Sequence, residues 1–371
     1  MAGHRSGGAL RTAHAAPGAR VGPAGTAAVG REAREEREAA FLAPGATRAA
    51  GAGRRECPEE PDPRRTCFER DRDRILHSSA FRRLAGKTQV FVFPDDHQRT
   101  RLTHALEVAQ VAVAIARATG LNTALTEAIA LGHDCGHGPG GHASEDALGG
   151  FLPGGYDHAV WGADIVLAPL NLCAETLDGV RNHSWSRPAP ATPEGEVVSW
   201  ADRIAYVCHD FEDAVSAGIV TAAALPEVVA ERCGTRRSSQ LRAFIGGVVD
   251  AIGSTGEVGM HDDLADALAT FRACNYERIY LRPASVAQAK AVVAVLRALV
   301  EHYTDRPNLL PCGRTPPDGH PHGTIEAGSE EAVRAAVTYV AGMTDRFAFE
   351  TAVARLGWDT TRLPEGVGLR R

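Results

Sequence analysis

A run of histidines and acids interrupted by glycines lies between residues 128 and 148, AIALGHDCGHGPGGHASEDAL. His133 stands directly before Asp134, and a neutral imidazole beside a carboxylate is a ligand pair suited to divalent metals. Five glycines among residues 132 to 141 allow backbone to approach a ligand closely. The run also carries His137, His142 and Glu145. These residue types in this pattern predict a metal-dependent active site.

Two more candidate metal ligands lie on other predicted helices. His104 is near the start of a helix expected over residues 100–118, and Asp202 is in the first turns of one expected over residues 197–220. Three helices of a bundle can bring such groups together around a metal ion. Taken singly, each has a structural explanation, since a lone His on an apolar helix is usually a core residue and an Asp near a helix start is favoured by the helix dipole.

Apolar periodicity predicts helices along most of the chain, and therefore an all-α fold with at most one short hairpin near residues 88–99. An arginine-rich helical stripe covers residues 64–84. The other expected helices cover residues 100–118, 123–134, 158–168, 170–180, 197–220, 226–233, 236–252, 261–273, 284–303 and 329–355.

Composition indicates where order begins in the 371-residue chain. Residues 1–60 are rich in Ala, Gly, Arg and Pro with few large apolar side chains, so most of them are expected to be disordered. One transient helix is expected within them, over residues 31–42. Residues 63–220 are expected to form the core, and residues 221–371 a C-terminal helical region that completes the same domain.

Charge and cysteine content narrow the class of protein. The net charge of −6 gives no general attraction to nucleic acid or to a membrane surface. The eight cysteines include no CxxC pair, which favours reduced thiols over a disulfide framework. No apolar run approaches the roughly 20 residues that span a bilayer. We therefore expect a cytoplasmic protein with no membrane partner.

The order His, His-Asp, Asp, with the sequence around it, resembles the HD-domain metal-dependent phosphohydrolases. The resemblance is closest to the deoxyguanosinetriphosphate triphosphohydrolase-like members, which are dNTP triphosphohydrolases. It covers about residues 63–355 and implies an HD-domain helical bundle with extra helices. Three blocks carry it: FERDRDRILHSSAFRRLAGKTQVF with DDHQRTRLTHALEVAQ, then ALTEAIALGHDCGHGPGGHASE, then VVSWADRIAYVCHDFEDAVSAGI.

The resemblance assigns the metal site and the groups that handle protons. His142 and Glu145 match a pair that activates the attacking water or relays protons, and His137 matches a phosphate contact. The spacing of His142 and Glu145 supports this assignment, because residues three apart share a helix face and a carboxylate can fix an imidazole tautomer. A structural pair in a turn is the alternative. The ligands implied for a divalent ion (Mn, Mg, Ni, Co, Fe or Zn) are His104, His133, Asp134 and Asp202.

The resemblance also assigns contacts to a nucleotide. Arg101 and Arg203 match cationic contacts to the triphosphate, and His158 matches a histidine that faces the active site in some relatives. Tyr206 and Asp210, four and eight residues after Asp202, lie on the same helix face. The residues that match contacts to the deoxyribose are Gln89, Tyr206 and Asp210.

The implied activity is metal-dependent hydrolysis of a dNTP to deoxynucleoside and inorganic triphosphate. Two alternatives stay open: a phosphohydrolase acting on dNMPs or other phosphoesters, and a weakly active nucleotide sensor. The sensor is motivated by HAVWG at residues 158–162, where relatives commonly carry an HNEQS-like run. The resemblance further implies a homo-oligomer and an allosteric dNTP. Single-stranded nucleic acid is a partner of some relatives that no feature of this sequence supports.

Overall fold

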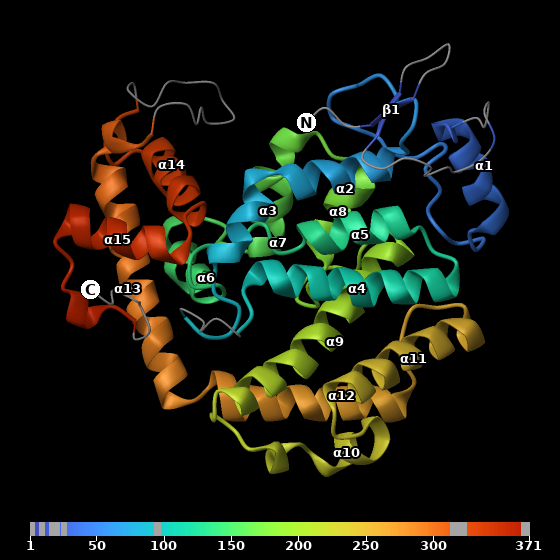
Figure 1. Cartoon of the computed structure of the whole chain (residues 1–371). Coiled ribbons are helices and arrows are strands. Elements are labelled where there is room, and N and C mark those ends of the chain that lie inside the picture. Colours follow the sequence, from blue (N-terminus) through green and yellow to red (C-terminus); the bar gives the residue numbers. More distant parts are fainter. Residues whose placement is uncertain are drawn as a thin grey trace.

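The computed structural model describes residues 4–6, 12–14, 23, 28–92, 98–311 and 325–364. These residues are mostly helical, which confirms the all-α fold (Figure 1). Their α-helices are α1 (Arg31–Phe41), α2 (Cys67–His77), α3 (Ser79–Arg83), α4 (Arg101–Thr119), α5 (Thr123–Gly132), α6 (Ala143–Leu148), α7 (His158–Trp161), α8 (Ala174–Asn182), α9 (Pro193–Ser216), α10 (Glu227–Cys233), α11 (Arg237–Thr255), α12 (Asp262–Asn275), α13 (Pro283–Asp305), α14 (Glu330–Ala341) and α15 (Asp345–Leu356).

The helices α4, α5 and α9 form the centre of the fold and the middle of a first hydrophobic cluster (Figure 1). α4 packs against both α5 and α9, and α2 covers α5. The buried side of α4 repeats small and branched apolar residues, including Val108, Ala112 and Ile115. α4 ends at Gly120, which adopts the left-handed conformation at φ 71° that glycine tolerates best. The Asn122 side chain then caps α5 by accepting from the Ala124 amide at 3.1 Å.

A second hydrophobic cluster joins α6 to the C-terminal helices α13, α14 and α15, at the left of Figure 1. α13 alone, among the described residues, is long and apolar enough to cross a membrane, contrary to the expectation that no such run exists. Core helices share that composition, and α13 packs against α6, α14 and α15. Its buried side chains are Val292, Val295, Leu296, Leu299, Val300 and Tyr303.

Part of the N-terminal segment that was expected to be mostly disordered packs on the core. Residues 28–60, expected to be mostly disordered, include α1 and turns that pack on the core, where Ala46 and Ala49 are buried. The buried Glu194 carboxylate accepts from the Thr47 amide at 3.0 Å and from the Thr47 hydroxyl at 2.7 Å. Composition missed this because polar contacts to a distant helix, rather than large apolar side chains, hold the segment.

Two further expectations differ from the structure in detail. The described strands, β1 (His4–Ser6) and β2 (Thr12–His14), pair antiparallel near the N-terminus. Near residues 88–99 there is only an isolated bridge from Thr88 to Thr100 among the described residues, and residues 93–97 lie outside them. The helix expected over residues 329–355 is two helices, because the chain turns after α14 and Thr344 caps α15 by accepting from the Phe347 amide.

Candidate active site

His133 and Asp134, here called the HD pair, lie where the two hydrophobic clusters meet. α5 belongs to the first cluster and ends at Gly132, so that His133 and Asp134 follow directly, while α6 belongs to the second cluster. His104 lies in the first turn of α4, and Asp202 faces it from α9. Because α4 packs against α5 and α9, the four predicted ligands lie close together.

The predicted ligand atoms form a compact buried set. The Nε2 of His104 lies 3.0 Å from the Oδ1 of Asp202 and 3.8 Å from the Oδ2 of Asp134. The Nε2 of His133 lies 3.5 Å from the Oδ1 of Asp134 and 3.8 Å from the Oδ1 of Asp202. An ion with ligands at about 2.1 Å places neighbouring ligand atoms roughly 3.0–3.4 Å apart. The four groups fit one divalent ion with small adjustments.

The protonation states of the predicted ligands also suit the binding of a cation. His133 donates from Nδ1 to the Ala130 carbonyl at 2.6 Å, and its buried Nε2 has no hydrogen-bond partner among the described residues. Burial by itself would raise the pKa of the Asp134 carboxyl, but Arg101, His133 and His137 lower it well below its usual value. Arg101 donates to Asp134 at 2.6 Å. Asp134 is therefore ionised, and an unpaired imidazole nitrogen faces it.

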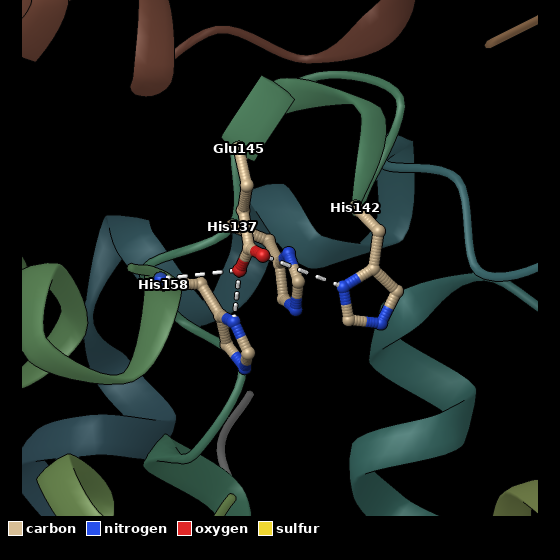
Figure 2. A group of neighbouring side chains, drawn as sticks. All are labelled: His137, His142, Glu145 and His158. Atoms are coloured by element: carbon tan, nitrogen blue, oxygen red, sulfur yellow. Dashed lines mark hydrogen bonds and ion pairs between the residues drawn. The ribbon is translucent and has the colours of Figure 1, made fainter. Parts of the chain in front are cut away.

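Glu145 lies between His142 and His158, and Figure 2 shows the arrangement. Its Oε1 accepts from the Nδ1 of His158 and from the His158 amide, the latter at 3.3 Å. Its Oε2 is 3.9 Å from the Nδ1 of His142, whose side chain is 73% exposed. Burial favours the neutral acid, yet His142 and His158 together hold the pKa of Glu145 far below its usual value. Glu145 thus orients His158 more directly than its predicted partner, His142.

His137 and His158 form a stacked pair beside the HD aspartate. Their ring centroids are 3.7 Å apart and their planes differ by 16°. The Nε2 of His137 lies 3.2 Å from the Oδ1 of Asp134. Burial, followed by Arg101 and His158, lowers the pKa of His137 well below its usual value, so the ring is neutral. His137 can therefore donate one hydrogen bond to a phosphate oxygen but carries no charge.

A cavity of about 740 Å³ opens over this set and brings the predicted substrate residues together. Of the predicted residues, only His133 and Glu145 do not line it; they lie behind the residues that do. The Arg203 guanidinium stacks on the Trp185 ring at 3.4 Å. The predicted site residues along its wall are Gln89, Arg101, His104, Asp134, His137, His142, His158, Asp202, Arg203, Tyr206 and Asp210.

Polar groups from α12 and the turn after it complete the wall, and the sequence analysis missed them. Arg272 donates from Nε to the Tyr206 hydroxyl at 2.9 Å. Tyr280 donates to the Asp210 carboxylate, which the buried Arg99 also binds. The only signal in the sequence was two arginines and two tyrosines in FRACNYERIY, which is too common a composition to single out.

His183 is a further residue that the sequence analysis missed. It follows α8, is buried, and places its ring 4.9 Å from that of His133. Its Nε2 lies 3.2 Å from the Nε2 of His158. A lone histidine in VRNHSW gives no spacing to the HD pair, so only the packing of α8 beside α5 reveals it.

The glycine-rich turn before α6 is held by the C-terminal helices. The buried Asp345 carboxylate accepts from the Gly140 amide at 2.8 Å, from the Thr88 amide at 2.8 Å and from the Thr88 hydroxyl. The buried Lys87 donates to the His137 carbonyl and, at 3.1 Å, to the Ala341 carbonyl. The start of α15 therefore positions the active-site turn.

We expect Asp345→Ala to lower the free energy of unfolding by about 1–3 kcal/mol, because buried amides of Gly140 and Thr88 lose their acceptor. Catalytic turnover should fall with it, since the turn loses its anchor. Denaturant unfolding monitored by circular dichroism measures the first effect. The matched control is Asp359→Ala, which removes an exposed carboxylate that caps a short turn in the same C-terminal region. Equal unfolding midpoints for the two variants would contradict the anchoring role.

Known proteins match the chain along most of its described length. A model of the HD domain matches residues 101–207, and a model of the phosphohydrolase-associated domain matches residues 258–353. A deoxyguanosinetriphosphate triphosphohydrolase-like protein of Caldanaerobacter subterraneus is 38% identical over 325 residues, covering 86% of this chain and 93% of that protein. A protein of the same description from Clostridium perfringens is 40% identical over 313 residues, covering 79% and 87% respectively.

Proposed function

The chain belongs to the deoxyguanosinetriphosphate triphosphohydrolase-like family of HD-domain phosphohydrolases, and we propose that it hydrolyses dNTPs to deoxynucleoside and inorganic triphosphate. One observation carries the proposal. His104, His133, Asp134 and Asp202 lie close together beside a cavity of about 740 Å³, whose walls carry arginines, histidines and tyrosines. A cation with arginines complements a triphosphate, which carries roughly four negative charges near neutral pH.

The phosphate end of the substrate lies, in this proposal, against the metal ligands. His104, His133, Asp134 and Asp202 would hold a divalent ion, which would supply a Lewis acid for attack on the α-phosphate. Arg101 reaches the same place, since its guanidinium already binds Asp134. Its Nε and Nη2 are buried and have no hydrogen-bond partner in the part of the chain that the structure describes. His137 donates from its neutral ring. Arg203 also lines the cavity and is the second cationic contact proposed for the triphosphate.

We assign proton transfer to Glu145, His142 and His158, which Figure 2 draws together with His137. The ionised Glu145 fixes the tautomer of His158, leaving the Nε2 of that ring without a proton when it is neutral. His142, on the cavity wall and mostly exposed, is free to exchange a proton with solvent and with the departing deoxynucleoside. Glu145 thus acts on two rings: it orients His158 and lies near His142.

The deoxyribose is assigned to the wall formed by α9 and the turn after α12. Asp210 is fixed by Arg99 and Tyr280 and still borders the cavity, so a carboxylate lone pair remains for the 3′-hydroxyl. Tyr206, held by Arg272, would crowd a 2′-hydroxyl. Gln89 borders the same cavity. The resemblance also implies a homo-oligomer and an allosteric dNTP. Both remain proposals, and no contact among the described residues supports them.

A screen of the four dNTPs against Mn, Mg, Co, Ni, Fe and Zn, with inorganic triphosphate as the readout, tests this function. We expect triphosphate and deoxynucleoside in equal amounts from at least one dNTP. Release of dNMP and pyrophosphate, or hydrolysis of dNMPs alone, would support the phosphoesterase alternative instead. Tight nucleotide binding without turnover, unchanged in His142→Ala, would support the sensor.

A further inference from the structure

Arg203 is held at the cavity wall by an aromatic ring rather than by an acid. Its guanidinium carbon lies 3.4 Å from the centroid of the Trp185 ring. No described carboxylate pairs with Arg203, and its buried Nε has no hydrogen-bond partner in the part of the chain that the structure describes. Arg101, the other arginine proposed to contact the triphosphate, is by contrast bound to the Asp134 carboxylate at 2.6 Å. The charge of Arg203 is therefore not shared with a described acid.

Trp185 is itself fixed by the turn that carries it and by a second tryptophan. It lies between α8 and α9, in a turn that the Arg187 amide closes by donating to the Ser184 carbonyl at 2.9 Å. Its ring meets that of Trp200 in a T-shaped contact, with the centroids 4.9 Å apart and the planes at 77°. Trp200 and Arg203 are three residues apart on α9 and so lie on the same side of the helix. The Trp185 ring therefore lies over this side of α9 and contacts both residues.

Stacking on an aromatic ring holds an arginine without using its hydrogen-bond donors. The attraction acts through the face of the guanidinium, whereas its N–H groups point outward in the plane of the group. A carboxylate partner would occupy those N–H groups, which a phosphate oxygen also needs. Because Arg203 and Trp185 both line the cavity, the stacked arrangement orders the guanidinium there before a ligand binds. Such ordering favours binding, since less side-chain freedom is lost when the ligand arrives.

Two simpler roles for Trp185 fit the structure less well. A tryptophan that serves only the core is expected to be buried, as Trp161 is at 8% exposure, but Trp185 is 49% exposed. A tryptophan that stacks on a nucleotide base needs a free face, and Arg203 already covers one face of this ring. The contact with the guanidinium is therefore the one that best accounts for the position of the ring.

We propose that Trp185 is a positioning residue, which holds the guanidinium of Arg203 at the cavity wall so that its N–H groups bind the oxygens of a triphosphate. Trp185 touches no phosphate itself and acts through Arg203. The inference rests on the proposed function, because that function places a triphosphate against Arg203. An interaction of this kind contributes to binding in the ground state and in the transition state alike, so its loss raises KM and leaves kcat nearly unchanged.

Binding of inorganic triphosphate to the full-length protein, measured by isothermal titration calorimetry in a buffer with Mn²⁺, tests the inference without a nucleotide. We expect Trp185→Ala to raise the dissociation constant about fivefold to tenfold. Trp185→Phe keeps an aromatic face and should bind nearly as the wild type does. Trp185→Leu keeps apolar bulk but has no such face, so it should behave as Trp185→Ala.

The matched control is Trp358→Ala, which removes another tryptophan with an arginine over its ring. The guanidinium carbon of Arg362 lies 5.1 Å from the centroid of the Trp358 ring, and Trp358 does not line the cavity. This variant should bind triphosphate as the wild type does. A loss of affinity equal to that of Trp185→Ala would mean that the effect of Trp185 is a general loss of stability, which would overturn the inference.

A double-mutant cycle shows whether Trp185 acts through Arg203. We expect Trp185→Ala to weaken triphosphate binding no further when Arg203→Ala is already present. An equal weakening in both backgrounds, wild-type affinity in Trp185→Leu, or weaker binding of a dNTP with unchanged binding of triphosphate would overturn the inference, and the last result would indicate base stacking. Should Trp185→Ala fail to fold, the comparison of Trp185→Leu with Trp185→Phe decides.

The proposed function and this inference fail in different experiments. Absence of dNTP hydrolysis would remove the function, while the triphosphate affinities of the Trp185 variants would still report on Arg203. Hydrolysis of a dNTP with wild-type KM in Trp185→Leu would overturn the inference alone. We expect instead a KM about fivefold to tenfold higher in Trp185→Leu, with kcat close to that of the wild type.

Discussion

Asp202→Ala is expected to remove the bound metal ion and to lower kcat/KM by at least about 10³-fold. A bound ion contributes several kcal/mol of charge stabilisation to phosphoryl chemistry, and each 1.4 kcal/mol or so is a factor of ten in rate. Asp202 is the simplest of the four proposed ligands to remove, because its carboxylate borders the cavity and contacts His104 and His133, and no described arginine pairs with it. Alanine at position 202 creates no closed cavity and leaves no guanidinium unpaired, whereas a change at Asp134 would leave Arg101 without its carboxylate partner.

Metal content and activity should therefore fall together in Asp202→Ala while the fold persists. Bound metal is measured by elemental analysis, and thermal unfolding is followed with and without a chelator. The wild-type melting temperature should fall on chelation, and that of the variant should not change. The matched control is Asp250→Ala, an exposed aspartate on α11, which should behave as the wild type. A fully metal-loaded and active Asp202→Ala protein would contradict the ligand assignment.

Glu145→Gln is the second substitution with a large expected effect, a decrease in kcat of about 10²-fold or more. The amide keeps the size of the side chain but loses the negative charge that orients His158 and lies near His142. Groups that orient a ligand or a proton-transfer residue contribute on this scale. KM should change much less than kcat, since Glu145 does not line the cavity.

Steady-state kinetics of Glu145→Gln with the best dNTP measures that separation. The control Glu301→Gln makes the same change at an exposed position on α13 and should leave both constants as in the wild type. If His142 alone were the partner of Glu145, His158→Ala would retain most of the activity. We expect it to lose activity as severely as Glu145→Gln. Wild-type kcat in Glu145→Gln would remove Glu145 from the mechanism.

The proposed metal ligands came from residue type together with the resemblance to the family. His133 and Asp134 are adjacent, and the resemblance added His104 and Asp202, which lie on long helices that apolar periodicity predicts. Tyr206 and Asp210 follow Asp202 at helical spacing and border the same cavity in the structure. For these residues, the sequence contains both the residue type and the element that positions it.

The rest depended on tertiary packing that no local pattern encodes. His183, Arg272 and Tyr280 reach the cavity from α8 and from the end of α12, and neither segment has a distinctive spacing to the HD pair. The preference of Glu145 for His158 arises because the first residue of α7 lies within hydrogen-bond distance of Glu145, whereas sequence spacing alone favoured His142. The anchoring of the active-site turn by Asp345 links residues 205 positions apart. Such contacts become visible only when the chain is folded.

The measurement that tests the central claim most directly is hydrolysis of a dNTP in heavy-oxygen water, with mass spectrometry of the products. Attack of water on the α-phosphorus with departure of the deoxynucleoside places the heavy oxygen in the inorganic triphosphate. We therefore expect one labelled oxygen in triphosphate and none in the deoxynucleoside. Label in a dNMP or in pyrophosphate, or in the 5′-hydroxyl of the deoxynucleoside, would contradict the account.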